Sequence, residues 1–282
     1  MMNRLVELLL GNLLDSPVFV VGAGRSGTSV LLRGLSLHPE ILPAEAEAPF
    51  VRDVGEFVNT VEFSSNSDYY LENLNISRNY LHRCLRRLCF ECVQGPYYGL
   101  RGIWGVGRRV LDLARVRRWC AKTFPEESGY RGLMQLYPNA RFVYIIRNGM
   151  DVVHSRTRFR GFRHLDFDVQ CRAWADSIGC FGYLNEAEAA ISVRHEDLVS
   201  DPESFFRAIF SFISVDFCDR PVEFVSSNLM HPLDEGTKSN IEVRQTIELR
   251  PPAYEDWTPE QCATFKEIAG EAMREAGYEM PF

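Results

Sequence analysis

The chain has 282 residues, of which 46% are apolar and 24% charged, ordinary values for a soluble globular protein. The net charge of −7 argues against nucleic acid as the main partner, and no apolar run approaches the roughly 20 residues of a membrane-spanning helix. We expect residues 1–282 to form a single α/β domain, because this length can bury one large core. The first 14 residues predict a short amphipathic helix rather than a signal peptide.

A short apolar run at residues 18–21 begins the most informative stretch. Its length and β-branched content are typical of a strand buried on both faces of a parallel sheet. A segment rich in glycine, serine and threonine follows at 22–29, and apolar residues at helical spacing begin at Val30. A strand, a Gly-rich loop and a helix in this order direct backbone N–H groups at a phosphate.

The Gly-rich segment departs at one position from the common phosphate-binding pattern G-x-x-x-x-G-K-[ST]. Gly22, Gly27 and Ser29 have the required spacing, but Thr28 replaces the lysine that neutralises the phosphates of ATP or GTP. The cation stands inside the loop instead, as Arg25. A Gly-rich turn without a ligand is the alternative, although packing gives no reason for these polar residues to cluster.

The sequence Arg25-Ser26-Gly27-Thr28-Ser29 resembles the loop with which sulfotransferases bind 3′-phosphoadenosine 5′-phosphosulfate (PAPS), and is close to the Arg-Ser-Gly-Thr-Thr form of tyrosylprotein sulfotransferases. The resemblance implies that these five residues bind the 5′-phosphosulfate. It also implies a P-loop-like parallel sheet flanked by helices, with an added helical substrate lobe. We place this acceptor-binding insertion at about residues 52–120, where the family is matched least.

A candidate general base follows the His-Pro pair that begins at His38. In carbohydrate sulfotransferases a glutamate three residues before a phenylalanine is the base, and Glu47 with Phe50 fits that placement. Tyrosylprotein sulfotransferases have the base one residue earlier, where this chain has Ala46. The resemblance therefore leaves the base open between Glu47 and its neighbour Glu45. Both glutamates could also be solvated loop charges.

The insertion is strongly basic. From residue 78 to residue 118, ten arginines stand against only Glu91 and Asp112. Apolar residues at helical spacing from Tyr80 to Leu88 predict an amphipathic helix with a basic face. The Gly- and aromatic-rich segment 94–107 suits a ring-bearing acceptor, although a solvated basic face and a packed loop explain the pattern equally well.

Two later segments extend the resemblance. Lys122 lies in a Lys-Thr-Phe-Pro sequence that resembles the turn whose lysine reaches the sulfuryl group in relatives. The apolar run 142–146 predicts a buried strand that ends at Arg147, and Ser155 lies on the helix that follows. In the family such an arginine and serine bind the 3′-phosphate of PAPS. A guanidinium at a strand end and a hydroxyl on the next helix can converge on one anion.

The remaining landmarks are less specific. Residues 191–198 resemble a strand that ends in Arg-Tyr-Glu-Asp-Leu, with His195 in place of the tyrosine. We expect Glu196 and Asp197 to tie loops together. Residues 230–250 predict an irregular segment with an unassigned basic contact to the cofactor, and 258–277 predict a capped helix.

Together these features imply sulfuryl transfer from PAPS to a hydroxyl or amine of a glycan, lipid or other small molecule, with PAP as the product. Glu47 would remove the acceptor proton, while Arg25 and Lys122 stabilise developing charge; no metal is expected. Cysteine usage and the absence of a membrane anchor favour the cytoplasm. A P-loop nucleotide kinase or NTPase and a non-catalytic PAP or PAPS binder are the alternatives. Acceptor identity and oligomeric state do not follow from the sequence.

Overall fold

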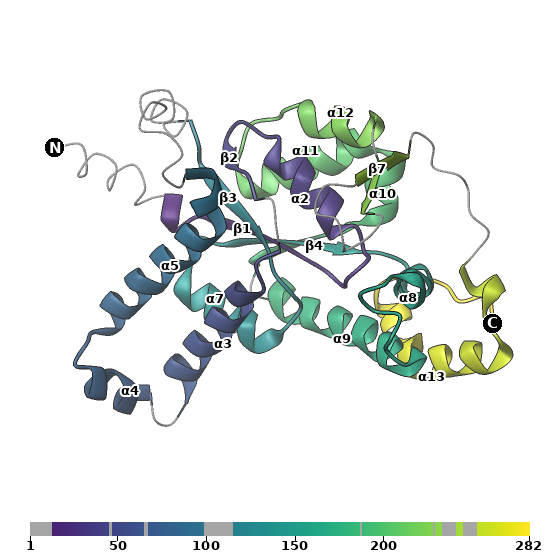
Figure 1. Cartoon of the computed structure of the whole chain (residues 1–282), viewed down its shortest axis with the longest axis horizontal. Coiled ribbons are helices and arrows are strands. Elements are labelled where there is room, and N and C mark those ends of the chain that lie inside the picture. The colour runs from purple at the N-terminus through teal and green to yellow at the C-terminus, as the bar shows by residue number, and fades with distance from the viewer. Residues whose placement is uncertain are drawn as a thin grey trace.

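A central parallel sheet organises the molecule. The computed structural model describes residues 13–44, 47–64, 67–98, 115–186, 188–227, 229–232, 241–244 and 253–282. The sheet has the order β2-β3-β1-β4-β5, and every neighbouring pair in it is parallel (Figure 1). Its strands are β1 (Pro17–Val21), β2 (Ile41–Leu42), β3 (Arg118–Lys122), β4 (Arg141–Ile146) and β5 (Ala190–Arg194). The expected α/β fold is therefore confirmed.

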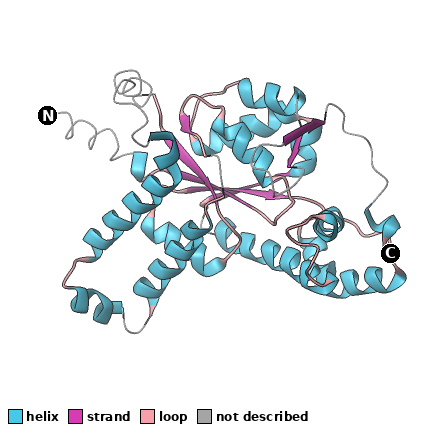
Figure 2. Cartoon of the chain, viewed as in Figure 1, coloured by secondary structure: helices cyan, strands magenta, loops and turns pink. Residues whose placement is uncertain are grey.

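Helices cover both faces of this sheet (Figure 2). One layer consists of α2 (Thr28–Ser36), α10 (His195–Ser200), α11 (Pro202–Ile213) and α12 (Arg220–Ser227). The other contains α3 (Pro49–Phe63), α7 (Glu127–Leu136), α8 (Gly149–Arg158), α9 (Phe167–Glu186) and α13 (Pro259–Glu275). A 3₁₀ turn, η2 (Ala253–Asp256), precedes α13.

The strand β1 occupies the centre of the core. All five of its residues are buried, as its unbroken apolar sequence requires for a strand covered on both faces. The Phe19 ring lies 5.9 Å from that of Trp119 on β3 and 5.2 Å from that of Phe142 on β4, measured between centroids. These contacts fix the relative positions of three neighbouring strands, and thereby the loops that leave them.

The helical lobe begins with a close helix contact. A Cβ atom on Gly132 of α7 would lie 1.8 Å from the carbonyl oxygen of Gly55 on α3, so the two helices touch backbone to backbone. The helices α4 (Ser67–Leu74) and α5 (Arg78–Tyr98) continue from α3 as a projecting arm (Figure 1). Arg86 ties α5 to the body, since its guanidinium donates to the Leu136 carbonyl and pairs with Asp15 at 3.0 Å.

The structure departs from the sequence predictions in two places. Residues 118–120, expected inside the insertion, belong to β3 of the main sheet, where Trp119 and Cys120 are fully buried. Basic residues on both sides of these apolar residues made the short strand hard to recognise in the sequence. Residues 230–250, expected to be irregular, contribute to an antiparallel pair, β6 (Leu229–Pro232) with β7 (Ile241–Arg244).

Other predictions fall on parts of the chain that the structure does not describe. The expected N-terminal helix lies almost wholly outside the described residues, and so does the aromatic segment from residue 99 onward. The capping box predicted at Thr258 is present, with reciprocal bonds to Gln261. None of the described helices has the length and apolar character needed to cross a membrane.

Candidate active site

Four neighbouring strands end at one edge of the sheet, and each delivers a candidate residue there. Lys122 is the last residue of β3, and Arg147 directly follows β4. The Gly-rich loop leaves β1 between them, and β5 runs into His195 on the other side. Because parallel strands place their carboxyl ends at a common edge, residues as far apart along the chain as Gly27 and His195 meet here.

The Gly-rich loop has a backbone shape that depends on its glycines. Gly27 has φ 95°, and a Cβ there would lie 2.5 Å from Cδ2 of His195. A side chain at Gly22 would meet the Ile145 carbonyl at 2.4 Å. Arg25 also adopts a left-handed conformation, with φ 81°, which is uncommon for a residue with a side chain and typical of functional loops.

The loop ends at a helix N-terminus that no side chain caps. Neither a capping hydrogen bond nor an acidic residue satisfies the first turn of α2. Its free N–H groups and the positive end of its dipole therefore favour an anion. Two hydroxyls nearby lack partners among the described residues: Ser26 Oγ in the loop and Thr123 Oγ1 beside it, each on a residue about 1% exposed. A buried hydroxyl without a partner is costly, which fits a polar ligand at this edge.

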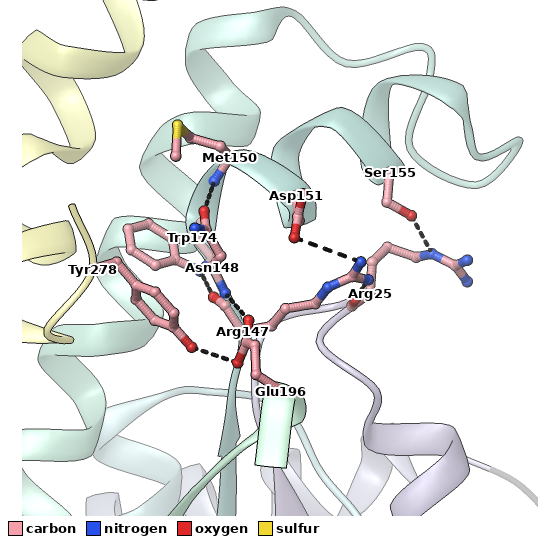
Figure 3. A network of polar contacts seen from close by, with 9 residues as sticks. All are labelled: Arg25, Arg147, Asn148, Met150, Asp151, Ser155, Trp174, Glu196 and Tyr278. Atoms are coloured by element: carbon pink, nitrogen blue, oxygen red, sulfur yellow. Dashed lines mark hydrogen bonds and ion pairs between the residues drawn. The ribbon is translucent and has the colours of Figure 1, made fainter. Parts of the chain in front are cut away.

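Arg25, Arg147 and Ser155 form one connected group (Figure 3). Arg25 Nε donates to Ser155 Oγ at 3.2 Å, and Arg147 Nη1 donates to the Arg25 carbonyl at 3.2 Å. Arg147 also pairs with Asp151 at 3.9 Å, and burial raises the pKa of that carboxyl group. Sequence reasoning assigned Arg25 and the Arg147/Ser155 pair to separate phosphates, whereas in the structure they contact each other directly.

Lys122 and Glu47 form a second group beside α2. The Lys122 ammonium pairs with a carboxylate oxygen of Glu47 and lies 3.4 Å from Ser29 Oγ. The backbone of Glu47 extends the sheet at the end of β3, where the next residue, Ala48, donates to the Lys122 carbonyl at 3.1 Å. Lys122 is 5% exposed, while the Glu47 side chain is 52% exposed and thus accessible to a substrate.

Glu196 holds the backbone beside Arg147 in place (Figure 3). One of its carboxylate oxygens accepts from the Asn148 N–H at 3.0 Å, and the other accepts from the Tyr278 hydroxyl at 2.8 Å. Burial next to this carboxylate raises the pKa of Tyr278. Trp174 Nε1 donates to the Arg147 carbonyl at 3.2 Å. Glu196 thus connects separate segments of the chain, as we expected. The contact that Tyr278 makes from the C-terminal segment was not predicted.

Two histidines lie outside this arrangement. His38 is at the opposite edge of the sheet, where Nδ1 accepts from the Glu40 N–H and Nε2 contacts the Asp216 carbonyl at 2.7 Å. Burial lowers the pKa of His38. His154 pairs with Asp256 at 3.7 Å on the outer side of α8. Glu45 lies outside the described residues. Within the described part of the chain, no cluster of three or more His, Cys, Asp or Glu side chains could hold a metal ion.

A parallel sheet with a Gly-rich strand-to-helix loop and converging cations defines a phosphate-binding α/β protein of the P-loop-like class. Comparison with known proteins narrows this class. The chain belongs to the sulfotransferase family, because the model of the Sulfotransferase family matches residues 17–219.

Among curated proteins, it is similar to a protein-tyrosine sulfotransferase of Drosophila melanogaster, with 21% identity over 245 residues, 82% of this chain and 45% of that protein. Protein-tyrosine sulfotransferase A of Caenorhabditis elegans is 24% identical over 213 residues, which cover 72% of this chain and 51% of that protein. The chain thus spans about half the length of the curated relatives it matches.

Solved structures share the fold. The sulfotransferase domain of the curacin biosynthetic pathway superimposes with a TM-score of 0.53 at 18% identity, over 95% of this chain and 100% of that one. A mouse sulfotransferase complexed with PAP gives a TM-score of 0.50 at 14% identity, over 94% and 89% of the two chains. At these identities the likeness establishes the fold and not the substrates.

Proposed function

We propose that this chain transfers a sulfuryl group from PAPS to an acceptor hydroxyl or amine and releases PAP. The observation that carries the proposal is the meeting, at one sheet edge, of an uncapped loop-helix junction, an arginine group and the Lys122–Glu47 pair. A phosphate-binding loop, further cations and an accessible carboxylate are the parts that the reaction needs. Family membership supports this function over a nucleotide kinase or NTPase, as does Thr28 in place of the P-loop lysine.

The chain offers two places for the donor's anionic groups. Residues 25–29 present helix N–H groups and hydroxyls, including the unpartnered Ser26 Oγ, to the 5′-phosphosulfate. Arg147 and Ser155 would hold the 3′-phosphate, since a guanidinium and a hydroxyl suit a phosphate and both lie beside the loop. The donor supplies the activated sulfuryl group.

Glu47 is the proposed general base. Its carboxylate is half exposed and can accept a proton from an acceptor within hydrogen-bond reach. Lys122, which holds this carboxylate here, would turn its ammonium toward the sulfuryl oxygens, and Arg25 would support the leaving phosphate. The Lys122–Glu47 pair therefore holds the base and the stabilising cation in contact before either acts.

The arm formed by α3, α4 and α5 is the proposed acceptor-binding lobe of this single domain. α3 begins two residues after Glu47, so the lobe grows directly from the proposed base. Aromatic side chains on this arm are notably exposed, at 42%, 51%, 66% and 48% for Phe57, Phe63, Tyr69 and Tyr80. Exposed rings support a glycan, lipid or other apolar or ring-bearing acceptor. The free cysteines support a reducing compartment, and we propose the cytoplasm.

Calorimetry with PAP and adenosine 5′-phosphate tests the donor assignment. PAP should bind far more tightly, and Arg147→Ala should abolish most of that preference because the 3′-phosphate loses its guanidinium. Arg172→Ala, on the exposed surface of α9, is the control and should leave both affinities unchanged. Equal affinity of the wild-type protein for the two nucleotides would refute the role of Arg147.

Turnover of labelled PAPS against a panel of acceptors tests the reaction itself. Lys122→Ala should lower kcat more than it weakens PAP binding, because PAP lacks the sulfuryl group. A defect confined to binding would mean that Lys122 only holds the donor or the fold. Tight PAP binding without turnover on any acceptor would instead favour a non-catalytic binding protein.

A further inference from the structure

Arg156 is a buried cation next to the Gly-rich loop. It follows Ser155 on α8, is 7% exposed, and its guanidinium lies 4.2 Å from the centre of the Phe162 ring. The other arginine of the same helix is exposed: the Arg158 side chain is 63% exposed and pairs with Asp256 at 2.6 Å. Burial alone therefore sets Arg156 apart from its neighbours.

The charge of Arg156 is not balanced by a carboxylate in the described part of the chain. Its Nε has no hydrogen-bond partner there, and the interaction that the structure gives its side chain is the contact with Phe162. Desolvation by burial lowers the pKa of Arg156, with no acidic group acting on it. An arginine nevertheless stays protonated at neutral pH. A buried, unpaired cation is costly, so its retention calls for an anion that arrives from outside.

The guanidinium points toward the loop itself. A Cβ built on Gly24 would lie 3.4 Å from Arg156 Nη1 and 3.0 Å from Cζ of Phe162. The absence of a side chain at Gly24 thus leaves room for the guanidinium against the loop backbone. In the same loop Ser26 Oγ is a second buried polar atom without a partner among the described residues.

We propose that Arg156 is a further cation of the donor-binding site, and that a phosphate group of the bound nucleotide neutralises its charge. The identity of this donor rests on the proposed function, whereas the need for an anion rests on the burial of Arg156. Two consequences separate this role from simple packing. The charge should strengthen anion binding, and in the absence of an anion it should destabilise the protein.

Arg156→Met, which keeps apolar contact with Phe162 and removes the charge, tests both consequences. PAP affinity, measured by calorimetry, should fall about 10-fold or more, as expected for the loss of a charge-assisted contact. The Tm of the nucleotide-free variant should equal or exceed that of the wild type. Arg156→Lys keeps the charge and should lose less affinity than Arg156→Met, although an ammonium does not reproduce the stacking on Phe162. Arg158→Met is the matched control and should alter neither PAP affinity nor the response of Tm to PAP.

The opposite pattern, a lower Tm with unchanged PAP affinity, would show that Arg156 only packs the turn around Phe162. If Arg156→Met does not fold, Arg156→Gln is measured in its place, and unchanged affinity in that variant refutes the proposal. Inorganic pyrophosphate serves as a second ligand. If the wild type binds pyrophosphate through Arg156 but does not bind PAP, the anion site stands and the proposed donor is wrong. If all variants bind PAP equally, the proposed donor stands and the role of Arg156 is refuted.

Discussion

Replacing Glu47 by glutamine is the sharpest test of the proposed chemistry, because the variant separates three effects. The first is turnover: without the carboxylate the acceptor proton has no base, and kcat should fall about 10²–10⁴-fold. That loss corresponds to roughly 3–5 kcal/mol of barrier. Glutamine keeps the size of the side chain, so the loss would not come from an altered cavity.

The second and third effects follow from the Lys122 pair. Lys122 is 5% exposed and the Glu47 side chain 52% exposed, so the pair lies between a surface and a buried ion pair. We expect the substitution to cost about 1 kcal/mol of unfolding free energy, which lowers Tm by about 2–4 °C. Lys122 would also keep an unbalanced positive charge beside the loop. PAP should therefore bind as tightly as to the wild type, or up to about fivefold more tightly.

Labelled-PAPS turnover, thermal unfolding and PAP calorimetry measure these three effects on one preparation. Glu45→Gln is the comparison variant and should keep most of the activity. The reverse result would move the base to Glu45. Full activity in both variants, or a clear loss of PAP affinity in Glu47→Gln, would refute the reasoning given for Glu47.

Three further predictions concern the framework of the site. Gly132→Ala should lower the unfolding free energy by more than 3 kcal/mol, because the added Cβ would overlap the Gly55 carbonyl. Thermal unfolding measures this loss, and a Tm near that of the wild type would contradict the close contact between α3 and α7. Burial lowers the pKa of His38 in the folded protein, so the unfolded chain takes up a proton at a higher pH than the folded protein does, and stability should fall as pH drops below about 6.5. His38→Gln should flatten this part of a profile of Tm against pH. An unchanged slope in the variant would contradict this role of His38. Tyr278→Phe removes the hydroxyl that holds Glu196 and should weaken PAP binding about 3- to 10-fold with little effect on adenosine 5′-phosphate; equal weakening of both nucleotides would indicate a general loss of structure.

The local parts of the site were predictable because their signals are contiguous in sequence. The apolar run at 18–21, the glycine spacing and the cation at Arg25 are enough to predict a strand, a loop and a helix N-terminus. Arg147 at the end of β4 and Ser155 on the helix that follows it both contact Arg25, as the geometry of a strand and the next helix allows. In these segments local backbone preference and the final fold agree.

The direct contacts between residues far apart in the chain were not predictable from the sequence. Lys122 and Glu47 are separated by 75 residues, and Tyr278 and Glu196 by 82, so only the order of the strands and the docking of α13 bring them together. Arg156 directly follows Ser155 in the sequence, yet the sequence did not predict it as a site residue. Arginines at alternate positions from 156 to 160 are alike in sequence, and the burial that distinguishes Arg156 is a property of the folded packing alone.

The central position of β1 also has a consequence for how the chain is made. Its hydrogen-bonded neighbours, β3 and β4, begin about 100 and 120 residues later in the sequence. At a synthesis rate of about 5–20 residues per second, this fully apolar strand leaves the ribosome several seconds before either neighbour. During that interval it is exposed to chaperones and to other nascent chains. The element at the centre of the sheet is therefore also a segment that is vulnerable to aggregation during biosynthesis.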